Sequence, residues 1–198
     1  MSLQPKTGYT FQEYLAAERE EMEIRHEFVA GEVFAMVGAT ANHNIIVSNL
    51  VGTLWTQTKG RPCLVYSNDM RVRIEAADAS AYPNLLARCG EQQHYDGRRD
   101  VLLNPSLIVE VLSPSTEAYD RGEKFAIYRR LPSLREYLLV SQTKISAELY
   151  VRQPDGRWML SEYDRPDAEM TLESIGCVLP MSEIYDKVGL GNSAVTSQ

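Results

Sequence analysis

The sequence predicts an α/β fold in which helices flank a mixed central sheet. Residues 107–112 (LIVEVL) form an apolar run typical of a strand that is buried on both faces. A helical pattern over 117–130 follows this run, and a second buried strand follows at 135–140 (REYLLV). With the segments before them, these elements have the order helix, three strands, helix, strand, which is that of an α/β sandwich.

Length and composition indicate one globular domain. The chain has 198 residues, of which 44% are hydrophobic and 24% are charged, and these proportions are ordinary for a soluble protein. We predict a single domain over residues 1–190 and a flexible tail over 191–198. The formal net charge of −7 argues against a broad, charge-driven coat for nucleic acid, although it leaves room for a local basic patch.

The sequence also indicates the cellular location of the protein and the redox state of its cysteines. The N-terminal segment lacks the apolar core of a signal peptide, and no apolar stretch of 18 residues occurs, so we expect a cytoplasmic protein without a membrane span. Cys63, Cys89 and Cys177 are odd in number, widely separated and without CxxC spacing. We therefore expect reduced thiols and no zinc site.

The N-terminal region begins with a predicted helix and a predicted hairpin. Residues 10–21 (TFQEYLAAEREE) have a helical pattern, with Thr10 as a candidate N-cap and Glu13 at the spacing of a capping box. Residues 25–37 (RHEFVAGEVFAMV) have the pattern of two short strands around Gly31. We expect this hairpin to be an N-terminal addition to the central sheet.

A longer helix and three strand candidates come next. Residues 41–60 place Ile46, Leu50 and Leu54 on one helical stripe, and Gly60 marks the end of the helix. The strand candidates are 63–66 (CLVY), 70–75 (MRVRIE) and 81–89 (AYPNLLARC), the last with its proline near the start, where a strand tolerates it. A polar loop then leads to the strand at 107–112.

The C-terminal third continues the alternation of helix and strand. Ser115 or Thr116 can cap the helix over 117–130, and a Leu-Pro pair stops it. Residues 145–163 are predicted to form a hairpin with Pro-Asp-Gly at its turn, as a C-terminal addition to the sheet. A short helix near 182–187 precedes the tail.

Glu110 is a carboxylate in the middle of an apolar strand. Side chains alternate along a strand, so Glu110 shares one face with Ile108 and Leu112. A buried carboxylate without a partner costs several kcal/mol or stays protonated. It is stable beside an Arg or Lys, or bound to a hard cation such as Mg²⁺, which often takes only one or two carboxylates together with waters and phosphates. A second acid from the neighbouring strand would complete such a site, and the neighbouring strand candidate carries Tyr82, Pro83 and Asn84.

A family resemblance covers nearly the whole chain. The segments YPN at 82–84 and LIVEVLSPST at 107–116, followed by DRGEK at 120–124 and LPSLREYLLV at 131–140, resemble the Uma two family of nucleases. This family has the restriction-endonuclease-like PD-(D/E)xK fold, and FQEYL, HEFVAGEV, NHNIIVSNL and SNDMRVRI extend the match toward the N-terminus. The resemblance implies a Mg²⁺- or Mn²⁺-dependent endonuclease that hydrolyses DNA phosphodiester bonds and works as a homodimer.

The resemblance also implies site residues. The first acid of the motif falls on Asn84, the second on Glu110, and the place of the motif lysine on Leu112, so the matching lysine is Lys124 in the next helix. A lysine stem is long enough to reach the site from there. We expect Glu110, Lys124 and Asn84 to be the catalytic residues, with Glu110, Asn84 and Asp69 as metal ligands. An outer pocket is expected from Glu27, His43, Asp120 and Tyr128.

Asn84 departs from the family pattern, which has aspartate at this position. An amide is neutral and therefore a poorer ligand for a divalent cation. Three explanations are open: a degenerate nuclease, compensation by Asp69 or Glu27, or an altered residue in this chain. A catalytically inactive nuclease-fold protein, retained to bind nucleic acid or protein, is the alternative function. A structural protein without nucleic-acid contacts is a third possibility, which the acidic pI of 5.1 favours.

Each site residue also has an ordinary structural interpretation. Glu110 is then a buried acid paired with a basic residue, and Lys124 a surface partner of Asp120 four residues earlier. Asn84 is then a strand-end hydrogen-bonding residue. His43 helps to start its helix and Asp69 caps a loop in the same interpretation. The arginines that could contact phosphates, but more often lie on solvated faces, are Arg71, Arg73, Arg98, Arg99, Arg121, Arg129 and Arg130.

Overall fold

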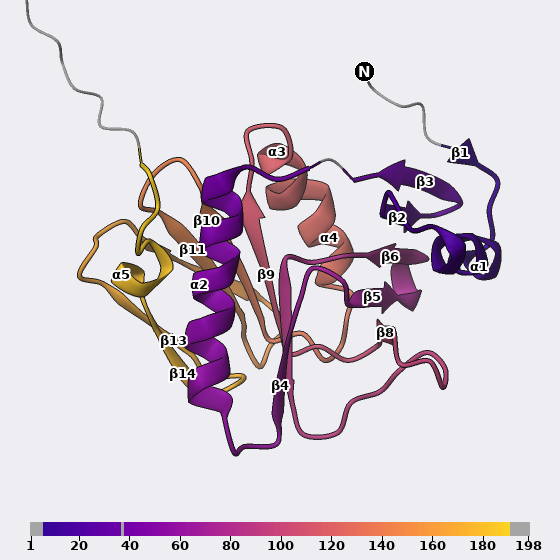
Figure 1. Cartoon of the computed structure of the whole chain (residues 1–198). Helices are drawn as coiled ribbons and strands as arrows, with labels where there is room; N and C mark the ends of the chain where they lie inside the picture. Colours follow the sequence, from indigo (N-terminus) through magenta and orange to yellow (C-terminus); the bar gives the residue numbers. More distant parts are fainter. Residues whose placement is uncertain (1–5, 37, 191–198) are drawn as a thin grey trace, which may run out of the picture.

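The computed structural model describes residues 6–36 and 38–190, so the predicted tail at 191–198 lies outside the described residues. A mixed sheet with the order β12-β11-β10-β9-β7-β4 forms the centre of the fold (Figure 1). β9 and β10 run parallel, and the other neighbours run antiparallel. The strands of this sheet are β4 (Cys63–Ser67), β7 (Leu85–Cys89), β9 (Leu107–Leu112), β10 (Glu136–Ser141), β11 (Ala147–Arg152) and β12 (Trp158–Tyr163).

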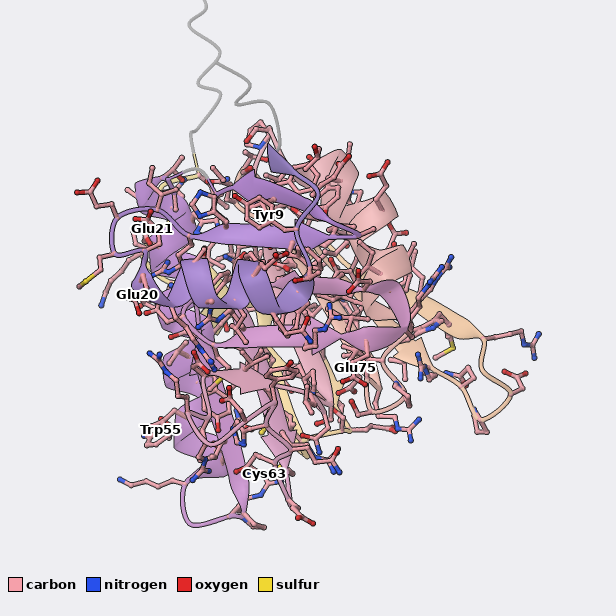
Figure 2. All side chains as sticks on the ribbon, turned by 90° about the vertical axis from the view of Figure 1, so that its right-hand side faces the viewer. Tyr9, Glu20, Glu21, Trp55, Cys63 and Glu75 are labelled. Carbon is pink, nitrogen blue, oxygen red and sulfur yellow. A yellow bond between two sulfur atoms is a disulfide. The ribbon has the colours of Figure 1, made fainter. Side chains whose placement is uncertain are left out.

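A second sheet with the order β1-β3-β2-β6-β5-β8 contributes to the core on one face of the central sheet. The helix α1 (Phe11–Glu20) crosses this second sheet, and Figure 2 labels Glu20 and Glu21 at its carboxyl end. The strands are β1 (Lys6–Thr7), β2 (His26–Val29), β3 (Glu32–Ala35), β5 (Arg71–Ile74), β6 (Ala79–Ala81) and β8 (Val101–Leu102), with a 3₁₀ turn at Glu75–Ala77.

The long helix α2 (Ala41–Thr58) packs on the opposite face of the central sheet. Its stripe of Ile46, Leu50 and Leu54 is fully buried, as the spacing predicts. A short helix and a two-stranded ribbon complete this layer: α5 (Met181–Ile184), β13 (Glu169–Leu172) and β14 (Cys177–Pro180). Within residues 6–36 and 38–190, no helix is both long and apolar enough to cross a membrane.

The predicted fold class is confirmed, with a mixed sheet between layers that contain helices. The two predicted hairpins are present as β2–β3 and β11–β12. They are integral parts of the two sheets, however, since β2 pairs with β6 and β11 pairs with β10. The prediction of one strand over 81–89 is wrong: β6 and β7 lie in different sheets, and Tyr82, Pro83 and Asn84 carry the chain from one sheet to the other. Pro83 has no backbone N–H to donate to a ladder.

β9 separates two hydrophobic cores. Leu107, Val109 and Val111 face the core under α2, whereas Ile108 and Leu112 face the core shared with the second sheet. This alternation matches the sequence pattern, and it directs Glu110 into the second core.

The helix after β9 differs in detail from its prediction. It consists of α3 (Glu117–Tyr119), a π-helical turn at Asp120–Lys124 and α4 (Phe125–Tyr128). The predicted cap is also different, because the Thr116 side chain makes no capping hydrogen bond and Ser113 Oγ accepts from the Thr116 N–H at 3.2 Å. A π turn places extra residues in one turn of helix and is frequent at functional sites.

Two arginines expected on solvated faces are buried. Arg71 donates to Asp100 at 2.5 Å, and Arg73 donates to Asp78 at 2.6 Å and lies 4.0 Å from the ring centroid of Phe11. The alternation of charged and apolar residues along β5 fits a half-exposed strand. The surrounding acids and aromatic rings allow it to be covered on both faces.

We expect Asp100→Asn to lower the free energy of unfolding by about 2 kcal/mol at pH 7, since it removes the counter-charge of a buried guanidinium. Hydrogen bonds from Arg19 hold the pKa of Asp100 below its usual range, and the charge of Arg71 acts in the same direction. Its contribution is therefore present above an unfolded pKa of about 3.9 and is lost as the pH falls through the folded value. Urea titrations should show a smaller difference between the two proteins at pH 3 than at pH 7; an equal difference would contradict this assignment.

The expectation of reduced thiols is wrong for two of the three cysteines. Cys63 and Cys89 face each other across β4 and β7 and form a disulfide, whereas the buried Cys177 is free. Neighbouring strands place directly opposite residues close together, which sequence spacing alone does not reveal. Figure 2 labels Cys63 at the end of its strand.

Candidate functional site

The carboxylate of Glu110 is enclosed by polar groups from three segments. Its Oε1 accepts from the Tyr128 hydroxyl at 2.9 Å and lies 3.0 Å from Lys124 Nζ. Its Oε2 accepts from the Asn84 N–H at 3.3 Å. Glu110 is only 3% exposed, and this burial raises its pKa to about 7 against the opposing charge of Lys124. The nearby acids Asp120 and Glu27 contribute to this rise in the pKa.

Lys124 is the cation at the centre of this cluster. Its Nζ lies 3.0 Å from Glu27 Oε1 and 3.7 Å from Asp120 Oδ1, in addition to its contact with Glu110. Burial lowers the pKa of Lys124, but the three carboxylates outweigh burial and hold the pKa well above its usual range. Lys124 is therefore charged at neutral pH. Because it is buried, the interpretation of Lys124 as a surface partner of Asp120 is wrong.

The helix after β9 and the second sheet bring these groups together. Asp120, Lys124 and Tyr128 are spaced four residues apart, so they lie on the face of the helix that meets β9. Glu27 comes from β2 in the second sheet. The next residue, Phe28, lies in a separate hydrophobic core together with residues of α1. The cluster therefore forms where the helix, the central sheet and the second sheet meet.

Asn84 lies beside Glu110, as expected, but its side chain forms a hydrogen bond with the backbone of β9. Its Oδ1 accepts from the Val111 N–H at 2.8 Å, which is the strand-end hydrogen bond of the ordinary interpretation. A carbonyl oxygen has two lone pairs, so this bond leaves one of them for a cation. The role of Asn84 as a ligand stays a prediction.

His43 and Asp69 differ in their relation to the cluster. Burial lowers the pKa of His43, while Asn84 and the charge of Asp120 oppose this, so His43 is a neighbour of the site. Asp69 lies on an exposed turn, where it pairs with Arg25, and its side chain is 74% exposed. The predicted metal ligation by Asp69 stays a prediction without a contact to Glu110 in the described residues.

Comparisons with known proteins show the family of this chain. The model of the Uma2 family, described as "Putative restriction endonuclease", matches residues 11–182. The chain belongs to the Uma2 family. Two similar proteins come from Synechocystis: "Uncharacterized protein slr1290" is 35% identical over 88% of this chain and 90% of its own length. "Uncharacterized protein sll1609" is 36% identical over 81% of this chain and 90% of its own length.

A solved structure shares the fold of this Uma2 protein. It is a crystal structure from Anabaena variabilis, described as "a putative nuclease belonging to DUF820". The TM-score is 0.75 at 17% sequence identity, and the match covers 90% of this chain and 98% of the other. At this identity the likeness shows a common fold, and it confirms the nuclease-like architecture.

Two tyrosines beside the Glu110 cluster were not predicted from the sequence pattern. The Tyr137 hydroxyl donates to the Asp120 carbonyl at 2.9 Å from the adjacent strand β10. The ring of Tyr119 lies 6.0 Å from Lys124 Nζ, and burial raises the pKa of Tyr119 to about 12. Both residues form the wall of the cluster. Tyr119 and Lys124 are five residues apart, which is close to one turn of a π helix. This spacing is the only sequence feature that could have indicated the contact between them.

The donor set of the Uma2 site fits a sparsely ligated divalent cation. Three acidic side chains face one ammonium group, and burial raises the pKa of two of them, Glu110 and Asp120. Within the part of the chain that the structure describes, no three His, Cys, Asp or Glu residues could hold a metal ion together. One or two carboxylates, with waters and phosphate oxygens as the other ligands, are a donor set that Mg²⁺ commonly takes.

Proposed function

We propose that this Uma2 protein is a divalent-cation-dependent endonuclease that hydrolyses DNA phosphodiester bonds. The observation that carries the proposal is the 3.0 Å contact between the buried Glu110 and Lys124, with Asn84 beside Glu110 in the segment that leads into β7. An acid, a lysine and a second oxygen ligand are the elements that such hydrolysis requires. Membership of a restriction endonuclease family supports the same reaction class.

Glu110 and Asn84 would hold Mg²⁺ or Mn²⁺, with Glu27 as the second carboxylate. Such an ion polarises a phosphoryl oxygen and lowers the pKa of water. Tyr128 orients the Glu110 carboxylate through its hydroxyl, and the charge of Lys124 opposes the rise in the pKa of Glu110 that burial causes. Lys124 also supplies the positive charge that stabilises the negative charge developing on phosphate.

The first test is a plasmid-nicking assay with Mn²⁺. We expect Glu110→Gln to lower nicking by at least about 100-fold, because it removes a charge from the ion and its partner from Lys124. Glu136→Gln is the matched control, since Glu136 is an equally buried acid that accepts from Glu173 and Ser174, away from the cluster. Equal activity of wild type and Glu110→Gln would refute the proposal, and so would an equal loss in both variants.

The bond from Val111 to Asn84 favours a second candidate function. With a neutral amide committed to the backbone, the chain would bind DNA or a protein through a nuclease fold without cleaving DNA. Fluorescence anisotropy with labelled DNA separates the two functions, because this second candidate binds without nicking and does not depend on Glu110. The expected homodimer also stays a prediction, and light scattering in solution measures it directly.

A further inference from the structure

The first turn of α2 has donor groups without intrahelical partners. The first N–H groups of a helix have no acceptor within it, and here these include Ala41 and Asn42. The N-cap Thr40 accepts from the His43 N–H at 3.2 Å, and its carbonyl accepts from the Asn44 N–H at 3.1 Å. The first turn has no acidic side chain, and the helix has 18 residues, so its dipole favours an anion at this end.

Gln142 adds an unpartnered buried donor at the same place. It follows the carboxyl end of β10, and its Oε1 accepts from the Thr40 hydroxyl. This bond places the Nε2 group of the same carboxamide at the start of α2. Gln142 is only 4% exposed, and Nε2 has no hydrogen-bond partner among the described residues. A buried amide donor normally has an acceptor, so this one indicates a ligand.

The start of α2 is also close to the Glu110 cluster. Gln142, which binds Thr40, follows Ser141, and Ser141 pairs with Leu112, two residues after Glu110. Figure 1 shows the start of α2, the carboxyl end of β9 and α3 at the same end of the molecule. Thr40 and Ala41 are exposed, so an anion in solution can reach the first turn.

We propose that the N-terminal end of α2, together with Gln142, binds a phosphate group of a nucleic-acid backbone adjacent to the phosphate at Glu110. A tetrahedral phosphate accepts several hydrogen bonds at once, and helix N-termini bind such groups. The assignment to nucleic acid rests on the proposed function, whereas the binding of phosphate does not. The subsite would fix the position of the strand relative to Glu110.

The test is a titration of ¹⁵N-labelled protein with inorganic phosphate in the absence of divalent cations. We expect the largest chemical-shift changes at the amides of Ala41 and Asn42. In Gln142→Glu, the new carboxylate repels phosphate at the helix start, so the affinity should fall at least tenfold. Gln142→Met, which removes the Nε2 donor and the Oε1 acceptor without adding a charge, should weaken binding less. Gln12→Glu makes the same charge change in α1 and should bind as wild type.

A short thymidine oligonucleotide separates the two sources of phosphate. Weaker oligonucleotide binding by Gln142→Glu, with no change for Gln12→Glu, supports a subsite for nucleic acid. Inorganic phosphate binding without any effect on the oligonucleotide overturns that assignment. Absent or scattered shifts, or wild-type affinity of Gln142→Glu, overturn the whole proposal. The shifts at Ala41 and Asn42 should persist in Glu110→Gln, so a failure of the nuclease proposal remains distinguishable.

Discussion

Replacing Lys124 with methionine should lower the free energy of unfolding by about 3–5 kcal/mol at pH 8, because it leaves three buried carboxylates without their cation. Methionine has a similar length, so packing changes little. We also expect a loss of nicking of at least about 100-fold, since the positive charge beside the phosphate is lost. Urea unfolding and the plasmid assay measure the two effects.

The loss of stability in Lys124→Met should depend on pH. The pKa values of Glu110 and Asp120 are already raised by burial, and without Lys124 they rise further. A carboxyl group with a raised folded pKa stabilises the protein fully below its unfolded pKa of about 4.3, and this contribution is lost as the pH rises through the folded value. The destabilisation should therefore be smaller at pH 5 than at pH 8. Lys144→Met, an exposed control, should change little, and equal effects of the two variants would contradict the central role of Lys124.

Asn84→Asp should tighten the binding of Mn²⁺ by about 10- to 100-fold, because it adds a unit of negative charge beside Glu110. The carboxylate can still accept from the Val111 N–H, which bonds to Asn84 at 2.8 Å, so the local backbone is preserved. Calorimetric titration measures the change. Gln12→Glu makes the same charge change at an exposed position of α1 and should leave the affinity unaltered.

The outcomes for Asn84→Asp separate the explanations of this site. Binding and nicking by the wild type would show that the amide and the nearby acids suffice. Silence of the wild type and rescue by Asn84→Asp would indicate a nuclease scaffold that lacks one charge. If neither protein binds Mn²⁺, the assignment of Glu110 as a metal ligand is wrong.

Local patterns predicted the elements whose residues determine them locally. The capping box of Thr10 and Glu13, the stripe of α2 and the alternation of β9 are confirmed. Two-residue strands such as β1 and β8 exist only through their partners. The β13–β14 ribbon was not predicted, although Glu169–Leu172 alternates in the expected way. The burial of Arg71 and Arg73 depends on Asp100 and Phe11, which lie far away in the sequence from the arginines that they contact.

Part of the candidate site could also be predicted, because some of its residues stand out in the local sequence. An acid inside an apolar strand marked Glu110, and the family resemblance marked Lys124 and Asn84, which the structure brings into contact with Glu110. The contact of Glu27 with Lys124 joins segments 97 residues apart (124 − 27), so no local spacing predicts it. Gln142 was missed because a polar residue after a strand is ordinary in a sequence.

The position of Lys124 links catalysis to folding order. One ammonium group joins a strand of each sheet and the helix between them, so no single layer can assemble the site. The charges at Glu27 and Glu110 remain mutually repulsive until the helix docks. Docking of the helix should therefore be a late, cooperative event. The cluster of charges is complete only in the fully folded tertiary structure. A partly folded chain would carry the acids of the proposed site without the cation that joins them.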